Sequence, residues 1–244
     1  MALDRNSNAF TFGFSIAMVI VVGSVLASLS VALKPAQQKN DRDKKMMDIL
    51  GAINVEADRK NAQELYDQYI IDSKVLNSKG EVIESDVAAF DIDKKKQFKD
   101  KTTSLEDRVH PLFIADKDGE KYYIMPMAGV GLWGPIWGFM SVGSDLNTIY
   151  GVRYAHAKET PGLGAEISSY DKFQKQWEGK VLSNDDGSFH AFLVSKTPAD
   201  PNDKHAVDGI TGGTITSKAV EEMVNRAVSV YAAYFEGLKN ESVQ

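Results

Sequence analysis

The sequence predicts an α+β protein with one N-terminal transmembrane helix, followed by a domain in which helices pack against an antiparallel sheet. Three observations lead to this prediction. An uncharged apolar run of 22 residues lies near the N-terminus, and short strand patterns separated by turns follow residue 111. An apolar stripe at helical spacing lies near the C-terminus, where a helix would bury it against the sheet.

The apolar run, Phe12–Leu33, spans a hydrocarbon core of about 30 Å at about 1.5 Å per residue. Lys34-Pro35 closes this uncharged run. A cleaved secretory signal is the alternative, because Ser30-Val31-Ala32 resembles a cleavage site, but the run is long for a signal sequence. The basic residues after the run favour a cytoplasmic domain, whereas long domains are translocated largely regardless of charge, so orientation stays open. These basic residues are Lys34, Lys39, Arg42, Lys44 and Lys45.

Composition excludes several classes of partner and of chemical site. The formal net charge of -6 argues against nucleic acid as a partner, because such binding needs a concentrated basic face. The chain has no cysteine, which excludes disulfides, thiolate metal sites and cysteine-ligated clusters. Redox chemistry would therefore use an organic cofactor or a non-thiolate metal. The four histidines lack metal-ligand spacing, and no nucleophile elbow or P-loop is present, so we predict neither a metal site nor a catalytic residue.

The chain divides into four predicted parts. A helical connector is expected to break near Gly51, and the charged segment Ser85–Arg108 is expected to be a solvated insertion or a loose helical stretch. A hairpin is expected where Val75-Leu76 and Val82-Ile83 flank a turn. The parts are residues 1–34 (tail and transmembrane helix), 35–70 (helical connector), 71–110 (hairpin and charged insertion) and 111–244 (the sheet domain).

Within residues 111–244 the strand patterns alternate with turn signals. Asp116–Gly119 predicts a hairpin turn, and the polar segment Pro198–His205 predicts a loop. The last helix is expected to begin at Thr216 or Ser217. The expected strands are 112–114, 121–125, 136–142, 149–157 and 189–194, with a short helix over 170–177 and the apolar helix face formed by Val220, Met223, Val224, Ala227, Val228, Tyr231, Tyr234 and Phe235.

The segment Gly129–Gly138 contains a literal G-x-G-x-x-G. A dinucleotide fingerprint must open a helix, whereas Pro135 and another strand pattern follow here, so we reject that interpretation. Glycines and two tryptophans between strands indicate a bend that presents an indole to a ligand. The alternative is a pair of core tryptophans with glycines that make room for them.

The segment Asp208–Ser217 places three glycines and four hydroxyl residues directly before the last helix. A turn with a helix N-cap is the simplest interpretation. The same composition also suits a phosphate, because glycines let the backbone approach a ligand and helix N-termini bind anions. No nearby residue is an obvious general base, so this segment is more easily a binding or attachment site than a catalytic one.

Three segments together resemble one family: Gly131–Gly134, Glu159–Gly164 and Asp208–Ser217. In this order after one membrane span, they are similar to a family of FMN-binding domains. Its members are NqrC, from the Na⁺-translocating NADH:quinone oxidoreductase, and RnfG, from the Rnf complex. The resemblance covers about residues 110–237, and the membrane span extends it to nearly the whole chain. Thr211 and Gly213 stand where the family motif commonly has serine and alanine.

The resemblance implies that FMN is joined through its phosphate to Thr214 by a separate flavin transferase that uses FAD and Mg²⁺. It also implies apolar walls for the isoalloxazine ring from Trp133 and Leu163, and polar groups near the ring or ribityl chain from Glu159 and Thr160. The other residues expected to bind the cofactor are Gly162, Gly164, Asp208, Gly209, Thr211, Gly212, Gly213, Thr216 and Lys218.

The function implied by the resemblance is electron transfer within a Na⁺-pumping NADH:quinone oxidoreductase that reduces ubiquinone or menaquinone. The implied partners are the other subunits, including a second covalent-flavin subunit, the flavin transferase and the lipid bilayer. The implied location is the bacterial inner membrane, with one span and the FMN domain on the periplasmic or outer side. The alternatives are the RnfG component of an Rnf-type ferredoxin:NAD electron-transport complex, and a membrane-anchored binding or assembly module without a redox role.

Overall fold

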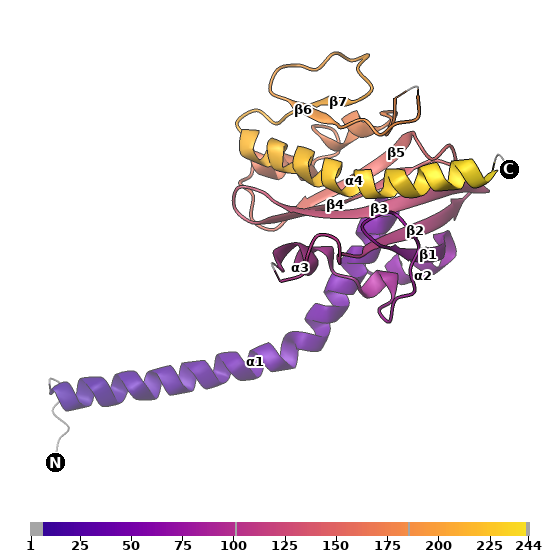
Figure 1. The fold of residues 1–244 in the computed structure, drawn as a ribbon. Helices are drawn as coiled ribbons and strands as arrows, with labels where there is room; N and C mark the ends of the chain where they lie inside the picture. Colours follow the sequence, from indigo (N-terminus) through magenta and orange to yellow (C-terminus); the bar gives the residue numbers. More distant parts are fainter. Residues whose placement is uncertain (1–6, 101, 185, 243–244) are drawn as a thin grey trace. The chain divides into compact units, whose positions relative to one another are not determined.

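The computed structural model describes residues 7–100, 102–184 and 186–242 (Figure 1). The chain forms two compact units, Met1–Lys45 and Met46–Gln244, which we describe separately. The first unit contains most of helix α1, Asn8–Gly51. Among the described residues, α1 is the one helix that is long and apolar enough to cross a membrane.

Helix α1 continues through Pro35, beyond the end of the uncharged run. Proline removes one intrahelical hydrogen bond, but long flanking stretches of helix-favouring residues carry the helix past it. The predicted break near Gly51 is confirmed, because α1 ends there. Around the end of α1, Ile49, Leu50 and Ile53 are completely buried in the second unit. The four-part division of the chain stays a prediction.

The second unit is built on a five-stranded antiparallel sheet in the order β1-β2-β3-β4-β5. Each strand lies beside its neighbour in sequence; short turns join β2 to β3, β3 to β4 and β4 to β5, whereas residues 77–109 connect β1 to β2. In the hairpin between β2 and β3, Asp118 and Gly119 both have positive φ, as the tight turn requires. The strands are β1 (Ile70–Leu76), β2 (His110–Lys117), β3 (Glu120–Val130), β4 (Pro135–Val142) and β5 (Ile149–His156).

Both faces of this sheet are covered. Helix α4, Thr214–Ser242, lies along one face (Figure 1), where its apolar stripe packs against β3. The predicted stripe is confirmed: Met223, Val228 and Tyr231 are among its buried members. The buried hydroxyl of Tyr231 donates hydrogen bonds to the carbonyls of Pro111 (2.8 Å) and Pro126 (3.2 Å), which ties α4 to β2 and β3.

The opposite face packs against the end of α1 and short elements of the charged region. The 3₁₀ helix η1, Ala89–Asp91, brings Ala89 into this core, and Ile92 is buried beside it. The prediction that the charged region is solvated is therefore wrong for this part. Helix α2 (Ala62–Tyr69) covers this face, whereas α3 (Lys94–Lys99) contacts β3 and β4. The hairpin expected after β1 is present, since Leu76 and Val82 form an antiparallel bridge.

Two predicted elements are shorter than expected. The helix predicted over residues 170–177 is only the 3₁₀ helix η3, Gln174–Trp177, preceded by a second 3₁₀ helix, η2, Gly164–Ser168. The strand predicted over 189–194 is β6, Leu193–Ser195, which pairs in parallel with β7, Ala206–Asp208. The amide of Phe192 donates instead to the Asn225 side chain of α4 (2.7 Å), so a side chain replaces a strand partner there.

Candidate functional site

A surface pocket of about 210 Å³ brings together the three motif segments of the sequence. The turn between β3 and β4 supplies one wall, the loop after β5 supplies a second, and the start of α4 supplies the third. The lining residues are Leu132, Trp133, Glu159, Thr160, Leu163, Gly164, Gly212, Gly213, Thr214, Ile215 and Thr216. Nine of the fourteen predicted cofactor-binding residues are in this set, although they come from segments far apart in the chain.

Glu159 joins the three segments. Its side chain is buried, and Oε1 accepts a hydrogen bond from the backbone amide of Trp133 at 2.9 Å. Oε2 accepts a hydrogen bond from the buried hydroxyl of Thr216 at 2.7 Å. One carboxyl group therefore holds the β3–β4 turn and the first turn of α4 against the loop after β5. This arrangement makes Glu159 a positioning residue beneath the pocket rather than a group at its mouth.

Two glycines make the close packing possible. A Cβ atom on Gly164 would lie 2.6 Å from Oε2 of Glu159 and would also collide with the hydroxyl of Thr216. Gly212 has a φ of +75°, and a Cβ there would lie 2.6 Å from a methyl group of Leu163. The backbone of the loop after β5 and the backbone before α4 thus approach each other as only glycine permits.

The four hydroxyl residues of Asp208–Ser217 differ in burial and in whether they line the pocket. The helix begins at Thr214, so the prediction that it begins at Thr216 or Ser217 is wrong. Thr216 and Ser217 are buried, and Ser217 Oγ accepts a hydrogen bond from the amide of Ile210 at 2.9 Å. Thr211 is exposed but does not line the pocket. Thr214 is both exposed and part of the pocket lining.

The pocket mouth is apolar and open. Exposed side chains surround it, among them Trp133, of which 62% is accessible, and Leu163, of which 42% is accessible. Trp133 is therefore not a core residue, and the interpretation of Gly129–Gly138 as a bend that presents an indole is supported at this position. Leu132 and Ile215 also line the mouth and are about half exposed. Sequence reasoning missed both, although each directly adjoins a predicted site residue.

Five predicted site residues do not line the pocket. Asp208 is structural: its Oδ1 accepts from the amide of Ala199 at 2.6 Å. Gly209 donates its amide to the carbonyl of Ser195 at 2.7 Å, and its backbone packs too closely there for a side chain. Lys218 forms an ion pair with Glu221 on the next turn of α4. The remaining two are Gly162, in a turn with φ +76°, and Thr211.

Comparison with known proteins decides the family. Residues 131–229 match the FMN-binding domain, a range that contains all lining residues of the pocket. The NqrC protein of the Na⁺-translocating NADH-quinone reductase from Haemophilus ducreyi is 33% identical over 89% of this chain and 88% of its own length. The chain belongs to the NqrC family. The Vibrio parahaemolyticus member is 30% identical over 91% of this chain and 90% of its own length.

Solved structures of the NqrC family share the fold. The Parabacteroides distasonis protein has a TM-score of 0.74 and 39% identity, and it covers 83% of this chain and 96% of its own. The Shewanella oneidensis protein has a TM-score of 0.66 and 26% identity, and covers 82% and 98% respectively. The predicted α+β class, an apolar N-terminal helix followed by an antiparallel sheet with packed helices, is thereby confirmed. The relatives named here are subunits of an oxidoreductase complex.

Proposed function

We propose that this chain is an electron-transfer subunit that carries FMN as a phosphoester of Thr214. The observation that carries the proposal is the position of that hydroxyl. Of the four hydroxyl residues of Asp208–Ser217, all of them within the described residues, Thr214 alone is exposed and also lines the pocket. A flavin transferase can reach such a hydroxyl, whereas the hydroxyl of Thr216 is held by Glu159.

The backbone around Thr214 suits a phosphodiester. The first amides of an α-helix have no intrahelical acceptor, and the helix dipole places positive potential at that end. Thr214 is the first residue of α4, a helix of 29 residues, so a phosphoryl group on its oxygen would meet these amides. Gly212 and Gly213 line the same pocket and let the phosphate approach the backbone.

The apolar mouth suits the isoalloxazine ring. Trp133, Leu163 and Ile215 offer apolar surface around Thr214, which flat aromatic groups favour. Because these side chains are exposed, one edge of a bound ring would remain accessible to another redox group. FMN supplies the electron chemistry, while the chain attaches and orients the cofactor and sets its surroundings.

The partners follow from the same proposal. The chain would exchange electrons with other subunits of a membrane NADH:quinone oxidoreductase, one of them a second covalent-flavin subunit, and the complex would reduce ubiquinone or menaquinone. Membership of the NqrC family, over about 90% of the chain, favours this complex over an Rnf-type complex. The non-redox alternative makes a different prediction: it requires NADH:quinone reduction to survive loss of the Thr214 hydroxyl.

Replacing Trp133 with alanine is expected to leave FMN attached but to raise its fluorescence severalfold, because an indole stacked near a flavin quenches its emission. Flavin emission and reduction potential of the purified full-length protein measure the effect. Trp137→Phe is the matched control, because Trp137 lies within β4 and does not line the pocket. Identical emission and potential in Trp133→Ala and wild type would exclude contact between this indole and the ring.

We propose that the globular unit lies on the periplasmic or outer side of the bacterial inner membrane, anchored by the single span in α1. The basic residues after the apolar run do not oppose this strongly, because long domains escape the positive-inside rule. Protease added to intact spheroplasts is expected to degrade residues 46–244 without lysis. Cleavage that requires lysis would place the domain in the cytoplasm. A cytoplasmic marker protein serves as the control for membrane integrity.

A further inference from the structure

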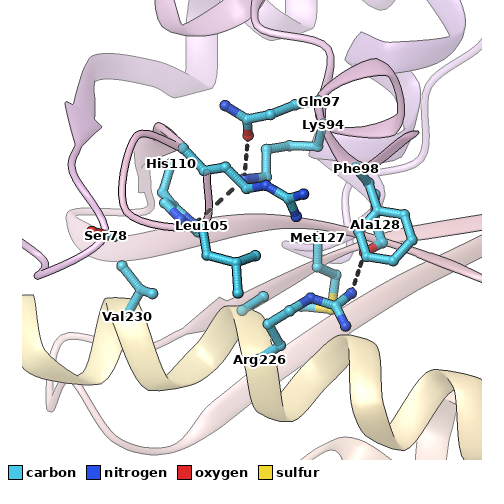
Figure 2. Close-up of a pocket in the computed structure, with 12 residues that line it drawn as sticks. Ser78, Lys94, Gln97, Phe98, Leu105, His110, Met127, Ala128, Arg226 and Val230 are labelled. Carbon is cyan, nitrogen blue, oxygen red and sulfur yellow. Dashed lines mark hydrogen bonds between the residues drawn. The ribbon is translucent and has the colours of Figure 1, made fainter. Parts of the chain in front are cut away.

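A second pocket, of about 220 Å³, lies between the α3 region, the sheet and the middle of α4 (Figure 2). It shares no lining residue with the pocket around Thr214. Its α4 wall includes Arg226, about 18 Å along the helix from Thr214. Much of the lining is apolar, with Phe98, Leu105 and Met127 facing the cavity (Figure 2). A binding function here would be separate from flavin attachment.

Basic groups dominate the polar part of this lining. Lys94, Arg108, His110 and Arg226 converge from α3, the loop before β2, β2 itself and α4. None of the 12 lining residues, all of them within the described chain, carries a carboxyl group. Two guanidinium groups, one ammonium group and one imidazole therefore surround one small cavity, and no carboxylate lies in its described lining.

Neutral acceptors hold these basic groups in place. The Lys94 ammonium donates to Gln97 Oε1 at 2.8 Å and to the carbonyl of Val109 at 3.0 Å. Arg226 donates to the carbonyl of Ala128 at 2.8 Å (Figure 2), and its guanidinium lies 4.5 Å from the centre of the Phe98 ring. Such contacts fix the side chains and leave their charge uncompensated.

Arg108 is the least satisfied member of the cluster. It donates one hydrogen bond, to the carbonyl of Asp100 at 3.3 Å, while its buried Nε has no hydrogen-bond partner among the described residues. The carboxyl group of Asp100 accepts hydrogen bonds from the hydroxyls of Thr102 and Thr103, and the charge of Glu222 acts on Arg226 from outside the lining. An unpaired guanidinium nitrogen beside a cavity is a donor that an anion would satisfy.

Burial and, to a smaller extent, neighbouring positive charges lower the pKa values of two members of the cluster. Burial, together with the charges of Arg108 and Arg226, lowers the pKa of Lys94 to about 7. Burial and the nearby Lys94 lower the pKa of His110 to about 3, so this imidazole is neutral. An anion in the pocket would favour the charged form of Lys94 and relieve the repulsion.

We propose that this pocket binds a small organic carboxylate. The carboxylate would lie between Lys94, Arg108 and Arg226, because the planar guanidinium fork matches carboxylate geometry. The hydrocarbon or aromatic part would lie against Phe98, Leu105 and Met127. This apolar wall distinguishes an organic carboxylate from inorganic phosphate, whose additional oxygens would have no donors there.

The probe for this site is para-fluorobenzoate, which combines one carboxylate with one apolar ring. Fluorine NMR line broadening, measured with the detergent-solubilised full-length protein, is expected to show saturable binding that excess benzoate displaces. The neutral analogue para-fluorobenzyl alcohol is expected not to bind. Inorganic phosphate at the same concentration is expected not to displace the probe. Equal broadening by the alcohol, or equal displacement by phosphate, would overturn the proposal.

Two variants test the basic groups independently. Lys94→Met and Arg226→Met are each expected to weaken binding about tenfold or more, because each removes a charged partner of the carboxylate. Lys121→Met is the matched control, since Lys121 is exposed on β3 and outside the pocket, and it should bind as wild type does. Circular dichroism identifies variants that remain folded. Unchanged affinity in folded Lys94→Met and Arg226→Met would refute the site.

A pH series distinguishes a role in binding from a role in folding. Lys94 has a pKa of about 7 and faces His110, Arg108 and Arg226. A bound anion stabilises the charged ammonium, so affinity is expected to rise as the pH falls from about 9 to about 6. The rise should disappear in Lys94→Met. A wild-type affinity that does not change across this range would contradict the assigned contact.

Discussion

Replacing Thr214 with valine is expected to abolish the flavin fluorescence that survives denaturation in a gel. Valine preserves the size and β-branched shape of threonine and removes only the hydroxyl, so α4 should still begin at this residue. The measurement is in-gel fluorescence of the full-length chain co-expressed with a flavin transferase. Since the proposed attachment is a single covalent bond, the expected loss is complete.

The matched control is Thr211→Val, which removes an exposed hydroxyl from the same segment but outside the pocket lining. It is expected to keep wild-type fluorescence. The assembled complex that contains Thr214→Val is expected to lose NADH:quinone reduction, because the electron path would lack one flavin. A fluorescent Thr214→Val band would refute the attachment site. If the Thr214→Val band shows no flavin fluorescence but the complex reduces quinone at the wild-type rate, the non-redox alternative is supported.

Replacing Glu159 with alanine is expected to lower the stability of the globular unit by about 2–4 kcal/mol, because two donors lose their acceptor. Those donors are the amide of Trp133 and the buried hydroxyl of Thr216. For a unit of this size the loss corresponds to a fall in Tm of about 5–15 °C. Thermal unfolding of the detergent-solubilised full chain, followed by circular dichroism, measures it. Flavin attachment should fall as well, since the pocket loses its shared support.

The control for Glu159→Ala is Glu166→Ala in the same loop. Glu166 forms an ion pair with Lys172, whose side chain is largely exposed, and such pairs contribute about 1 kcal/mol or less. Thr216→Val completes a double-mutant cycle with Glu159→Ala, and a positive coupling between the two is expected because they share a hydrogen bond. Additive effects of the two substitutions, or a Tm for Glu159→Ala equal to that of Glu166→Ala, would contradict this role.

Local signals explain which elements were predictable from the sequence. The Asp118-Gly119 turn was predictable because its conformation depends on two adjacent residues that tolerate positive φ. The buried face of α4 was predictable because helical periodicity alone aligns residues such as Val224 and Tyr231. In both cases the required information lies within a few residues of the chain.

Elements that depend on distant partners were not predictable. The segment 170–177 was expected to be helical, but Phe173 and Trp177 are both completely buried beside Tyr154, and this packing rather than periodicity sets the backbone. The hydrogen bond from Thr216 to Glu159 joins residues 57 positions apart, so no local pattern reveals it. The same holds for Lys94, whose place in a basic run gave no sign of its burial.

Sequence position indicated which segments meet at the pocket, whereas the hydrogen bonds of individual residues depend on how the segments fold together. The family resemblance implies that Glu159 is a polar group near the ring or ribityl chain, which stays a prediction; the structure adds that its buried carboxyl group accepts a hydrogen bond from the amide of Trp133. Lys218 was expected near the phosphate, yet its described contact is the ion pair with Glu221. Sequence position placed both residues near the site, while their hydrogen bonds depend on how the segments fold together.

Tandem mass spectrometry of the peptide that contains residues 208–217 can assign covalent FMN to a single side chain. The full-length protein would be purified after co-expression with a flavin transferase and digested without reducing the flavin. A phosphoester at Thr214 predicts a peptide heavier by the mass of FMN less one water, with the added group on Thr214. The same added mass on Thr211, Thr216 or Ser217, or its absence from a fully flavin-loaded protein, would contradict it.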